Sequence, residues 1–585
     1  MATGGSPYEC DKSVYRPLPS IFNMDIMSKL ADIRSLKSLS DVADFLGCEP
    51  KNLAYSLYFA KNKYKSFEIY KKSGGVRIIN APNEKLKSLQ KILAGYLSEC
   101  LDEIYNTHGG NKISHGFVKG KTIITNASQH RNKNLVFNID LSDFFNTINF
   151  GRVRGFFIKN KYFSMDEKAA TVFSQIACHE GRLPQGSPCS PVISNLILNI
   201  LDIRLASLAF KNSCNYTRYA DDLTFSTNRK EFPIDIVKDE LGDWVVGNKL
   251  HKEITKCGFI INKSKTRLQY KDSRQDVTGL VVNKFVNVPS DYRRLTKSMA
   301  HELFRTNEFY IKLPDGESIE GTQNQLNGML SYIYSTRKIT IHKNFDSTIP
   351  RDGKGIPILD ASDRLYSDFL FYKNFVANDK PIVICEGKTD VVYLKHAIKS
   401  RYEKYPNLVE IKKKEKALKI QILGASFLVN HLLDLLTGTT AIKRFVESYA
   451  TRLSKYKCPP LNNPVIILTD NDDGIKGLIH AINGKYKESE DRDGIYFITS
   501  NLYLIRTPLL NDKNSSKIED FFTKELLARK LDGKTFHPDN DTDNTMHYSK
   551  QVFVEKIIKK EYKSIDFSGF DSIINLLEKT IIDHK

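Results

Sequence analysis

Two adjacent aspartates, Asp221 and Asp222, stand inside a β-prone segment of this chain. The flanking runs, residues 215–218 and 223–226, predict a hairpin with the two acids at its tip. Adjacent carboxylates repel each other, so a fold that exposes them together usually does so to hold cations. A solvated acidic turn is the alternative, and two other stretches of the chain argue against it.

The first stretch, residues 135–139, is an apolar strand that ends in Asp140, and the second, residues 183–191, is a Gly-Ser-Pro loop that leads into an apolar helix. In order and spacing, the strand-end acid, the loop and the later acid pair resemble the palm of a reverse transcriptase. The resemblance implies that Asp140, Asp221 and Asp222 hold two Mg²⁺ ions. One ion would activate the primer hydroxyl, and both would neutralise charge on the transferred phosphate.

The same resemblance assigns five further positions to the substrate, namely Arg77, Phe145, Gln185, Gly186 and Lys265. Arg77, on a basic Gly-Gly hairpin, would grip the incoming triphosphate. Phe145 would lie under the sugar and exclude a 2′-OH, so that deoxynucleotides are preferred. Gln185 and Gly186 would lie against the nascent base pair and template, and Lys265 is a candidate general acid near the pyrophosphate. The alternatives are a solvated hairpin, a packed core phenylalanine and an exposed lysine without a role.

Two short elements narrow the resemblance to the retron reverse transcriptases. They are Asn-Ala-Ser-Gln-His at residues 126–130 and Val-Thr-Gly at residues 277–279. Group II intron and diversity-generating enzymes share the palm but are not expected to show this pair of elements. The resemblance implies that the following residues take part in recognising the cognate structured RNA: Asn126, Ala127, His130, Val277, Thr278 and Gly279. A hydrogen-bonded structural histidine is the alternative.

Residues 291–306 predict a basic amphipathic helix that carries Arg293 and Arg294. Such a helix fits a thumb that tracks the minor groove of a primer–template duplex through phosphate contacts. An ordinary charged surface helix is the alternative. Residues 325–334 and 362–375 are also predicted to be helical, as the rest of the thumb or as a connector.

From Lys380 onward the pattern changes to alternating strands and helices, which favour a parallel sheet with its site at the strand ends. Apolar strands are predicted at residues 381–385 and 464–469, each followed by acids, with a further strand at 432–436 and a helix at 442–449 between them.

The acids that follow these strands, Glu-Gly-x-x-Asp and Asp-x-Asp, resemble those of the Toprim domain of topoisomerases, bacterial primases and OLD-type nucleases. The resemblance implies that Glu386, Asp470 and Asp472 bind one or two Mg²⁺ ions and act on a phosphodiester, with Asp390 supporting the metal shell. Gly474 stands one residue closer to the acids than in many such loops, which leaves the ligation geometry open. Residues 518–522 add Glu519 and Asp520. Acids that only cap helices are the alternative.

Nuclease chemistry is the favoured activity of this second centre. A topoisomerase needs a tyrosine nucleophile and a gate domain for which the region has no room, and a primase would be redundant beside a polymerase.

The bulk composition agrees with a multidomain nucleic-acid enzyme. A chain of 585 residues predicts two to four domains, and a net charge of +19 points to a polyanionic partner. No apolar run approaches the roughly 18 residues that span a bilayer, and the N-terminus lacks a signal-peptide pattern. Nine cysteines without a Cys-x-x-Cys pair argue against a disulfide framework and a zinc site. A cytoplasmic protein without a membrane partner is expected.

The predicted fold class is multidomain, α+β and α/β: a right-hand reverse transcriptase followed by a Toprim-like parallel-sheet domain. The expected divisions are an N-terminal helical region (1–60), fingers and palm (61–285), thumb and connector (286–376) and the Toprim-like domain with a C-terminal extension (377–585).

The resemblance implies a retron enzyme that copies its cognate non-coding RNA into branched, RNA-linked single-stranded DNA (msDNA) from a 2′-OH, with a nuclease effector for antiphage defence. Its expected partners are that RNA, the msDNA, deoxynucleoside triphosphates and a host ribonuclease H, and an oligomer with msDNA is expected. The alternatives are a bacterial reverse transcriptase primed at a 3′-OH and a nucleic-acid-binding scaffold with an inactive Toprim domain.

Overall fold

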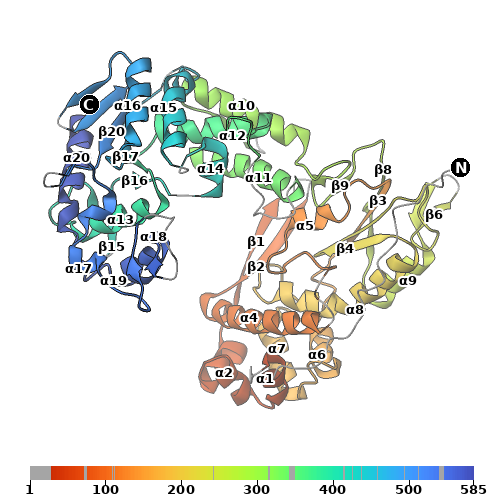
Figure 1. The fold of residues 1–585 in the computed structure, drawn as a ribbon. Helices are drawn as coiled ribbons and strands as arrows, with labels where there is room; N and C mark the ends of the chain where they lie inside the picture. Colours follow the sequence, from red (N-terminus) through yellow and green to blue (C-terminus); the bar gives the residue numbers. More distant parts are fainter. Residues whose placement is uncertain are drawn as a thin grey trace, which may run out of the picture. The chain divides into compact units, whose positions relative to one another are not determined.

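The structure is a computed structural model, and it divides the chain into two compact units, residues 1–286 and 287–585, each described here by itself (Figure 1). The first part of the expected N-terminal region and the tip of the basic hairpin lie outside the described residues. The structure describes residues 28–584 except 71–74, 108–109, 111, 241–242, 314–315, 342–349, 413–414, 425, 436–437, 458, 493, 511–512 and 539–545.

The centre of the first unit is a four-stranded antiparallel sheet in the order β4-β5-β3-β8. β3 is buried along its whole length, which explains its nearly continuous apolar sequence. The predicted hairpin and strand are confirmed, and the register places Asp140 of β3 directly opposite Asp222 of β5. The strands are β3 (Leu135–Leu141), β4 (Asn215–Tyr219), β5 (Asp222–Thr227) and β8 (Ile261–Tyr270).

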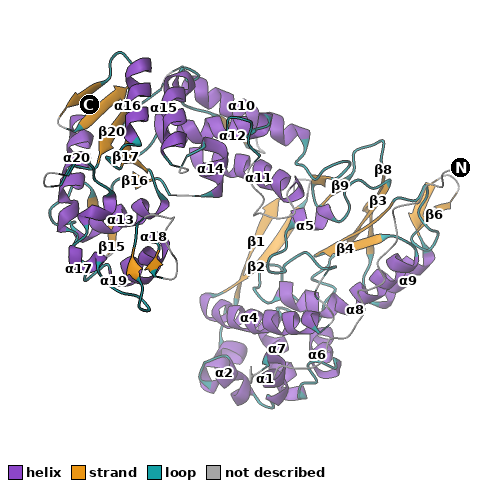
Figure 2. Cartoon of the chain, in the orientation of Figure 1, coloured by secondary structure: helices purple, strands orange, loops and turns teal. Residues whose placement is uncertain are grey.

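Helices and three small hairpins complete this unit, and α8 packs against β4, α4 and α9 (Figure 2). The helices are α1 (Lys29–Ser35), α2 (Leu39–Phe45), α3 (Pro50–Ala54), α4 (Glu84–Asn106), α5 (Ile123–Ser128), α6 (Phe150–Lys159), α7 (Glu167–Ala177), α8 (Ser190–Lys211) and α9 (Asn248–Lys256). The hairpins are β1 (Tyr64–Tyr70) with β2 (Val76–Pro82), β6 (Val237–Glu240) with β7 (Asp243–Val246), and β9 (Asp276–Val277) with β10 (Leu280–Val281).

Helix α8 corrects one expectation. By length and composition alone its 22 residues could cross a membrane, with a window of mean hydropathy 1.6, although no such apolar run was expected. Within the described chain it is the one helix that meets this test, and 56% of that window is buried in the protein. Its apolar sequence follows from this burial, because the helix lies in the core between the palm sheet and other helices.

The second unit begins with the predicted basic helix, which the structure confirms as α10 (Ser290–Thr306), and the two helices expected after it form α11 (Gln323–Ile341) and α12 (Ala361–Phe371). Side chains of these helices share one hydrophobic core with the strands that follow, for example Leu303, Leu330 and Phe369 with Ile384. The expected boundary at 376/377 therefore falls inside this unit.

A six-stranded sheet in the order β16-β13-β17-β20-β19-β18 forms the rest of the second unit. The first four strands are parallel, and β19 and β18 are antiparallel. The strands predicted at 381–385 and 464–469 are confirmed as the neighbours β13 and β17. Their side chains alternate between two cores, with Ile384 on one face and Val383 on the other, so both faces of the sheet are covered.

The strand predicted at residues 432–436 is wrong. The Ser426 side chain accepts a hydrogen bond from the backbone of Val429 and starts a helix, α14 (Phe427–Leu433), which ends at Asp434 in the left-handed region. The strand that pairs with β13 on the side opposite β17 is instead the short strand β16 (Gln421–Ile422). The helix predicted at 442–449 is confirmed as α15 (Thr439–Leu453).

The remaining helices of this unit are α13 (Lys388–Ser400), α16 (Ile475–Lys485), α17 (Lys524–Leu527), α18 (Lys550–Phe553), α19 (Lys559–Glu561) and α20 (Asp571–Asp583). The remaining strands are β11 (Tyr310–Lys312), β12 (Ser318–Glu320), β13 (Ile382–Cys385), β14 (Val409–Lys412), β15 (Glu415–Leu418), β17 (Val465–Thr469), β18 (Glu490–Arg492), β19 (Ile495–Thr499), β20 (Leu502–Arg506), β21 (Thr535–Phe536) and β22 (His547–Tyr548).

Candidate functional site

The three palm acids meet where β3 and β5 lie side by side. Asp140 and Asp222 face each other across the strands, and the backbone N–H of Leu141 donates to the carbonyl of Asp221 at 3.1 Å. From β8, the ammonium of Lys265 lies 3.1 Å from the Asp140 carboxylate. A cavity of about 170 Å³ opens here, lined by Asn138, Ile139, Asp140, Asp222, Lys265, Arg267, Thr278 and Gly279.

The pKa values of two of these acids are raised. Burial, with the neighbouring charges of Asp221 and Asp140, raises the pKa of Asp222 to about 7. Burial and the charge of Asp140 also raise the pKa of Asp221. Carboxylates that oppose one another's ionisation in a buried place favour a cation beside them. Asp140, Asp221 and Asp222 therefore fit a divalent ion chemically.

The described residues hold no group of three or more His, Cys, Asp or Glu side chains already arranged around a metal position. In the palm, the Asp140 carboxylate instead accepts hydrogen bonds from Lys265 and from the amide of Asn262, at 3.0 Å. Lys265 is thus a partner of Asp140, and its predicted contact with pyrophosphate stays a prediction.

A buried arginine fixes the hairpin that carries the acid pair. Arg218 is fully buried on β4 and pairs with Asp202 of α8 at 2.7 Å. Its guanidinium also donates to Asn195 at 3.1 Å and to the carbonyl of Ala220 at 3.1 Å, in the turn just before Asp221. The turn is therefore tied to α8 from within the core.

A second constraint on the turn comes from Gly116. A Cβ atom at this position would lie 2.4 Å from the backbone nitrogen of Ala220, closer than any side chain tolerates. The Gly116 carbonyl accepts a hydrogen bond from Asn195 at 2.9 Å, so the segment cannot easily move away. Ala220 itself has a φ of 55°, in the left-handed region. Only glycine at position 116 permits this close approach.

Three other predicted substrate residues, Arg77, Gln185 and Gly186, lie on β2 and on the loop that contacts it. The charge of Arg77, on β2, reaches Asp221 and opposes the rise in its pKa. The carbonyl of Gln185 accepts from the backbone of Asn80 at 2.7 Å, and Gly186, with a φ of 119°, approaches the same β2 residue closely. The loop and the hairpin therefore support each other, and the nucleic-acid contacts of Arg77, Gln185 and Gly186 stay predictions.

Phe145 and its neighbour Phe144 differ in burial. Phe144 is 3% exposed, whereas Phe145 is half-buried against it with ring centroids 5.1 Å apart. Contact of Phe145 with a sugar stays a prediction.

The first retron-like element lies in the core, and its predicted part in recognising the RNA stays a prediction. Asn126, Ala127 and His130 have no exposed surface. Both ring nitrogens of His130 are hydrogen-bonded at 2.7 Å, to Ser226 and Thr217, and Thr217 donates to Asn126 at 2.6 Å. Burial lowers the pKa of His130 to about 3, so the imidazole is neutral. These residues brace the palm strands.

The second retron-like element packs on the first. Val277 is buried, and the hydroxyl of Thr278 donates to the carbonyl of Ile123 on α5 at 3.3 Å. Thr278 and Gly279 both have positive φ and form the tight turn between β9 and β10. Because Thr278 and Gly279 also line the cavity at the acids, this turn is the part of the two elements that a nucleic acid could reach.

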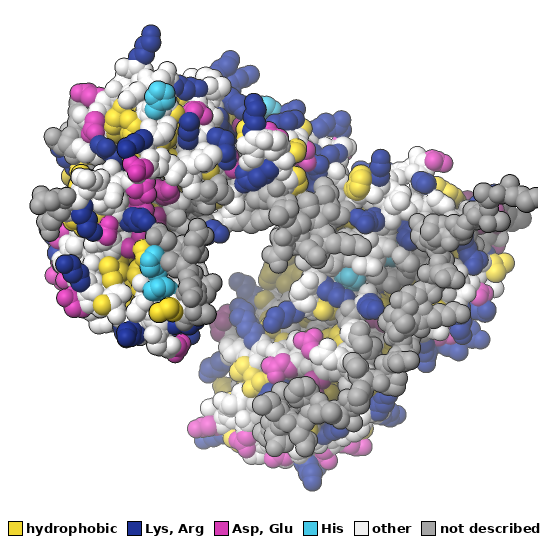
Figure 3. Space-filling model, viewed as in Figure 1, with side chains coloured by type: hydrophobic (Ala, Val, Ile, Leu, Met, Phe, Trp, Pro, Cys, Tyr) yellow, Lys and Arg dark blue, Asp and Glu magenta, His cyan; other side chains and the backbone are white. Residues whose placement is uncertain are grey.

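The two predicted thumb arginines lie on α10 in the second unit. Arg294 is exposed and forms an ion pair with Asp291, whereas Arg293 is half-buried. Lys and Arg side chains are spread over the visible face of each unit (Figure 3), as the net charge of +19 requires. Phosphate contacts of Arg293 and Arg294 stay predictions.

The second group of acids gathers at the carboxyl ends of β13 and β17. Glu386 and Asp470 follow these parallel neighbours directly. Burial, with the charges of Asp390, Glu519 and Glu386, raises the pKa of Asp470 to about 7. We call Glu386, Asp390, Asp470 and Glu519 the acidic cluster. Mutual repulsion in a buried place again fits a divalent cation.

Several of these carboxylates also accept hydrogen bonds. Glu386 accepts from the hydroxyl of Thr439 at 2.6 Å, and Asp470 from the backbone of Ile518 at 2.8 Å. Asp390 caps α13 through the backbone N–H of Gly387 at 2.7 Å.

Asp472 and Asp520 have contacts of their own. The Asp472 carboxylate accepts from the backbone of Gly474, the residue before α16, at 2.9 Å, and Asp520 pairs with Lys513 at 3.2 Å. Neither charge is among those that raise the pKa of Asp470. The predicted role of Asp472 as a metal ligand stays a prediction.

Sequence reasoning missed two members of this centre. Lys550 lies 2.8 Å from Glu519, whose side chain is 4% exposed and whose pKa is raised by burial despite that partner. Thr439 reaches Glu386 from the start of α15. Both come from distant segments without a local pattern, so only the folded chain reveals them.

The palm sheet and its acids define the class of protein. Residues 69–282 match the family described as reverse transcriptase (RNA-dependent DNA polymerase). The chain is 32% identical over 312 residues to the retron Mx65 reverse transcriptase of Myxococcus xanthus, covering 50% of this chain and 67% of that protein. It is 30% identical over 272 residues to the retron Ec86 reverse transcriptase of Escherichia coli, covering 46% and 79%. The chain belongs to the retron reverse transcriptases.

As a member of this family it is an RNA-directed DNA polymerase that takes an RNA template and deoxynucleoside triphosphates. Reverse transcriptases generally use Mg²⁺ in the palm, where it supplies activation of the primer hydroxyl and neutralisation of phosphate charge. The matches to these two relatives span about half of this chain. A solved structure of apo telomerase from Candida tropicalis, truncated from its C-terminal domain, also matches, with a TM-score of 0.27 and 13% identity over 40% of this chain and 56% of that chain.

We predict that Gly116→Ala lowers RNA-templated deoxynucleotide incorporation by about 100-fold, because the new methyl group displaces the turn before the acid pair and an error of about 1 Å costs roughly that factor. The measurement is incorporation on a primed RNA template by the purified protein. Gly155→Ala, in open space on α6, is the matched control. Wild-type incorporation by Gly116→Ala would contradict the prediction.

We predict that Asp222→Asn raises the melting temperature at pH 8 in EDTA by about 2 °C or more. In a large domain, a shift of this size corresponds to a gain of roughly 1 kcal/mol in the free energy of unfolding. The folded pKa of about 7 lies above the ordinary 3.8, so the charged side chain is destabilised in the folded state above pH 7 and relieved as the pH falls through 7. The gain should therefore shrink at pH 6. Asp272→Asn, at an exposed turn, should change the melting temperature at neither pH. An equal gain at both values of pH would contradict this origin.

Proposed function

We propose that this protein copies a cognate structured non-coding RNA into branched, RNA-linked single-stranded DNA, primed from a 2′-OH within that RNA. The observation that carries the proposal is membership in the retron reverse transcriptases together with a palm in which Asp140 and Asp222 face each other. The proposed partners are this RNA, its msDNA product and a host ribonuclease H, in the cytoplasm, with an oligomer that includes msDNA.

We further propose that the second unit carries a Toprim-like, Mg²⁺-dependent nuclease that acts as the effector in antiphage defence and is restrained by the bound nucleic acid. Support comes from the acidic cluster, which joins acids from two parallel strand ends with a buried glutamate. A capping box explains the Asp390 contact and a turn hydrogen bond to Gly474 explains that of Asp472, but neither explains why Asp470 and Glu519 are buried beside other acids. The burial of Asp470 and Glu519 beside other acids favours a metal-dependent site over an inactive scaffold.

The first test sequences the nucleic acid that copurifies with the protein after expression with its RNA. We expect DNA joined to RNA by a 2′,5′ bond that debranching enzyme cleaves, and none from Asp221→Asn combined with Asp222→Asn, because the palm would lack two of its three acids. Asp272→Asn should leave the yield unchanged. DNA joined only through a 3′-OH would contradict the priming proposal and leave the polymerase intact.

The second test removes the RNA and follows growth and nucleic-acid degradation in cells that express the protein. We expect arrest with the wild-type chain and at least tenfold less degradation with Glu386→Gln or Asp470→Asn, because each change removes a charge from the acidic cluster. Asp473→Asn, an exposed neighbour paired with Lys476, is the matched control. Growth arrest that persists unchanged in both cluster variants would contradict the nuclease proposal.

A further inference from the structure

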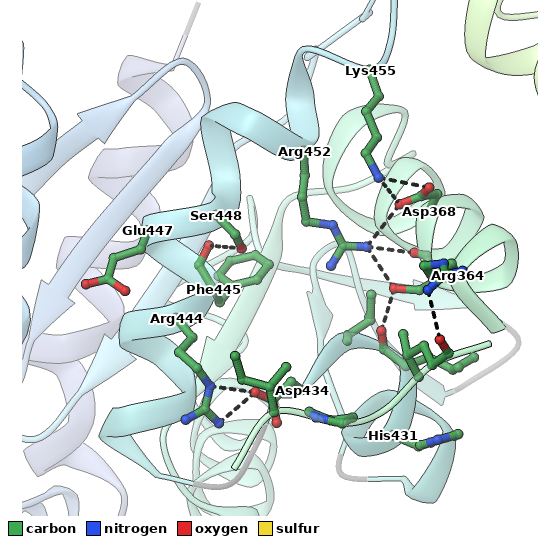
Figure 4. A pocket seen from close by; sticks show the side chains of 16 residues that line it. Arg364, Asp368, His431, Asp434, Arg444, Phe445, Glu447, Ser448, Arg452 and Lys455 are labelled. Carbon is green, nitrogen blue, oxygen red and sulfur yellow. Dashed lines mark hydrogen bonds and ion pairs between the residues drawn. The ribbon is translucent and has the colours of Figure 1, made fainter. Parts of the chain in front are cut away.

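The second unit contains a cavity of about 490 Å³ whose lining includes no member of the acidic cluster (Figure 4). It lies among α12, α14, α15 and the segment at residues 356–359. This volume is within the range of small-molecule sites, which are mostly apolar with a few convergent polar groups.

One part of the lining is an apolar floor. Leu432, Leu433 and Phe445 are buried members of the core of the unit, and Leu359 packs against them. At the mouth, Ile356 is 40% exposed. The floor therefore offers a surface on which a flat, weakly polar group can lie.

The other part of the lining is positively charged. Asp434 pairs with Arg444 at 2.6 Å and with Arg351, a neighbour outside the lining, at 2.8 Å, so the three side chains together keep a net positive charge. Asp368 is likewise shared by Lys455 and Arg452, at 2.8 Å and 3.7 Å.

Two further charged side chains, Arg364 and Glu447, belong to the lining of the cavity. Arg364 donates to a carbonyl, that of Leu359 at 3.1 Å, and so adds a third positive charge. The last carboxylate of the lining, Glu447, points away from Asp368 and Arg364 in Figure 4. The cavity therefore favours an anion.

Arg452 is the most constrained of these cations. It lies over the ring of Phe371 at 4.4 Å, and one of its terminal nitrogens donates to the carbonyl and hydroxyl of Ser367 at 3.0 and 2.9 Å. Burial lowers its pKa. Among the described residues, the structure gives no hydrogen bond for its other two nitrogens, so this half-buried guanidinium keeps donors for a ligand.

We infer that this cavity binds a nucleotide, with the base on the apolar floor and the phosphate held by Arg452, Arg364 and Lys455. Guanidinium groups bind phosphate through paired N–H donors, and an inorganic anion alone would leave the apolar floor unused. The ligand is either a free nucleotide or the terminal nucleotide of a single strand, which present the same chemistry. The inference does not depend on the nuclease proposal.

The test photolabels the purified full-length chain, freed of nucleic acid, with 8-azido-ATP and maps the labelled peptides by mass spectrometry. EDTA is present so that metal-dependent binding at the two acid centres is suppressed. We expect label in peptides of α12, α14 or α15, and competition by unlabelled ATP or by a ten-nucleotide single-stranded DNA. Stronger competition by ATP assigns a free nucleotide, and stronger competition by the oligonucleotide assigns a strand end.

Two variants test the geometry by different routes. Arg364→Gln removes an exposed cation, and Ser448→Tyr fills the cavity from α15, so each should weaken binding at least tenfold. Lys443→Gln, on the same helix outside the lining, is the matched control, and melting temperatures verify folding. The inference is overturned by label that maps elsewhere, by wild-type binding in both folded variants, or by inorganic phosphate that competes as well as ATP.

Discussion

The palm depends on one buried ion pair, between Arg218 of β4 and Asp202 of α8. Both side chains are almost inaccessible to water, so their mutual attraction mainly offsets the cost of removing two charges from solvent. Its structural consequence is larger than its net energy, because loss of one partner would leave the other charge buried at a cost of about 3–5 kcal/mol. The same guanidinium holds the Ala220 carbonyl. The place of Asp221 and Asp222 is thus fixed by the core.

This fixed turn makes a destabilised pair of acids tolerable. Carboxylates would separate if the chain allowed it, but Gly116 on one side and Arg218 on the other leave the turn no room. In the second unit, repulsion between carboxylates is opposed differently. The ends of two parallel strands hold Glu386 and Asp470 together, and the charge of Lys550 offsets part of the negative charge. In both centres one aspartate has a pKa near 7, as expected where stability is given up for a cation site.

Much of this arrangement could be predicted from the sequence because it follows from short local patterns. An apolar strand that ends in an acid specifies both the strand and the position of Asp140 or Asp470. The burial of a residue depends on distant segments, and short local patterns do not predict it. Asn126 and His130 form a short motif, yet they hydrogen-bond to strands about ninety residues away and contact no solvent. The apolar residues at 432–436 favoured a strand, and the cap at Ser426 decided for a helix.

Helix α15 connects the acidic cluster with the cavity of the second unit. Its first residue, Thr439, donates to Glu386 of the acidic cluster, while Arg444 and Arg452, further along, line the basic cavity. A helix of 15 residues with a buried apolar face is stiff, so its two ends move together. A shift large enough to repack the cavity would also change the hydrogen bond to Glu386. The acid centre and the cavity are therefore separate in chemistry and joined by a single rigid element.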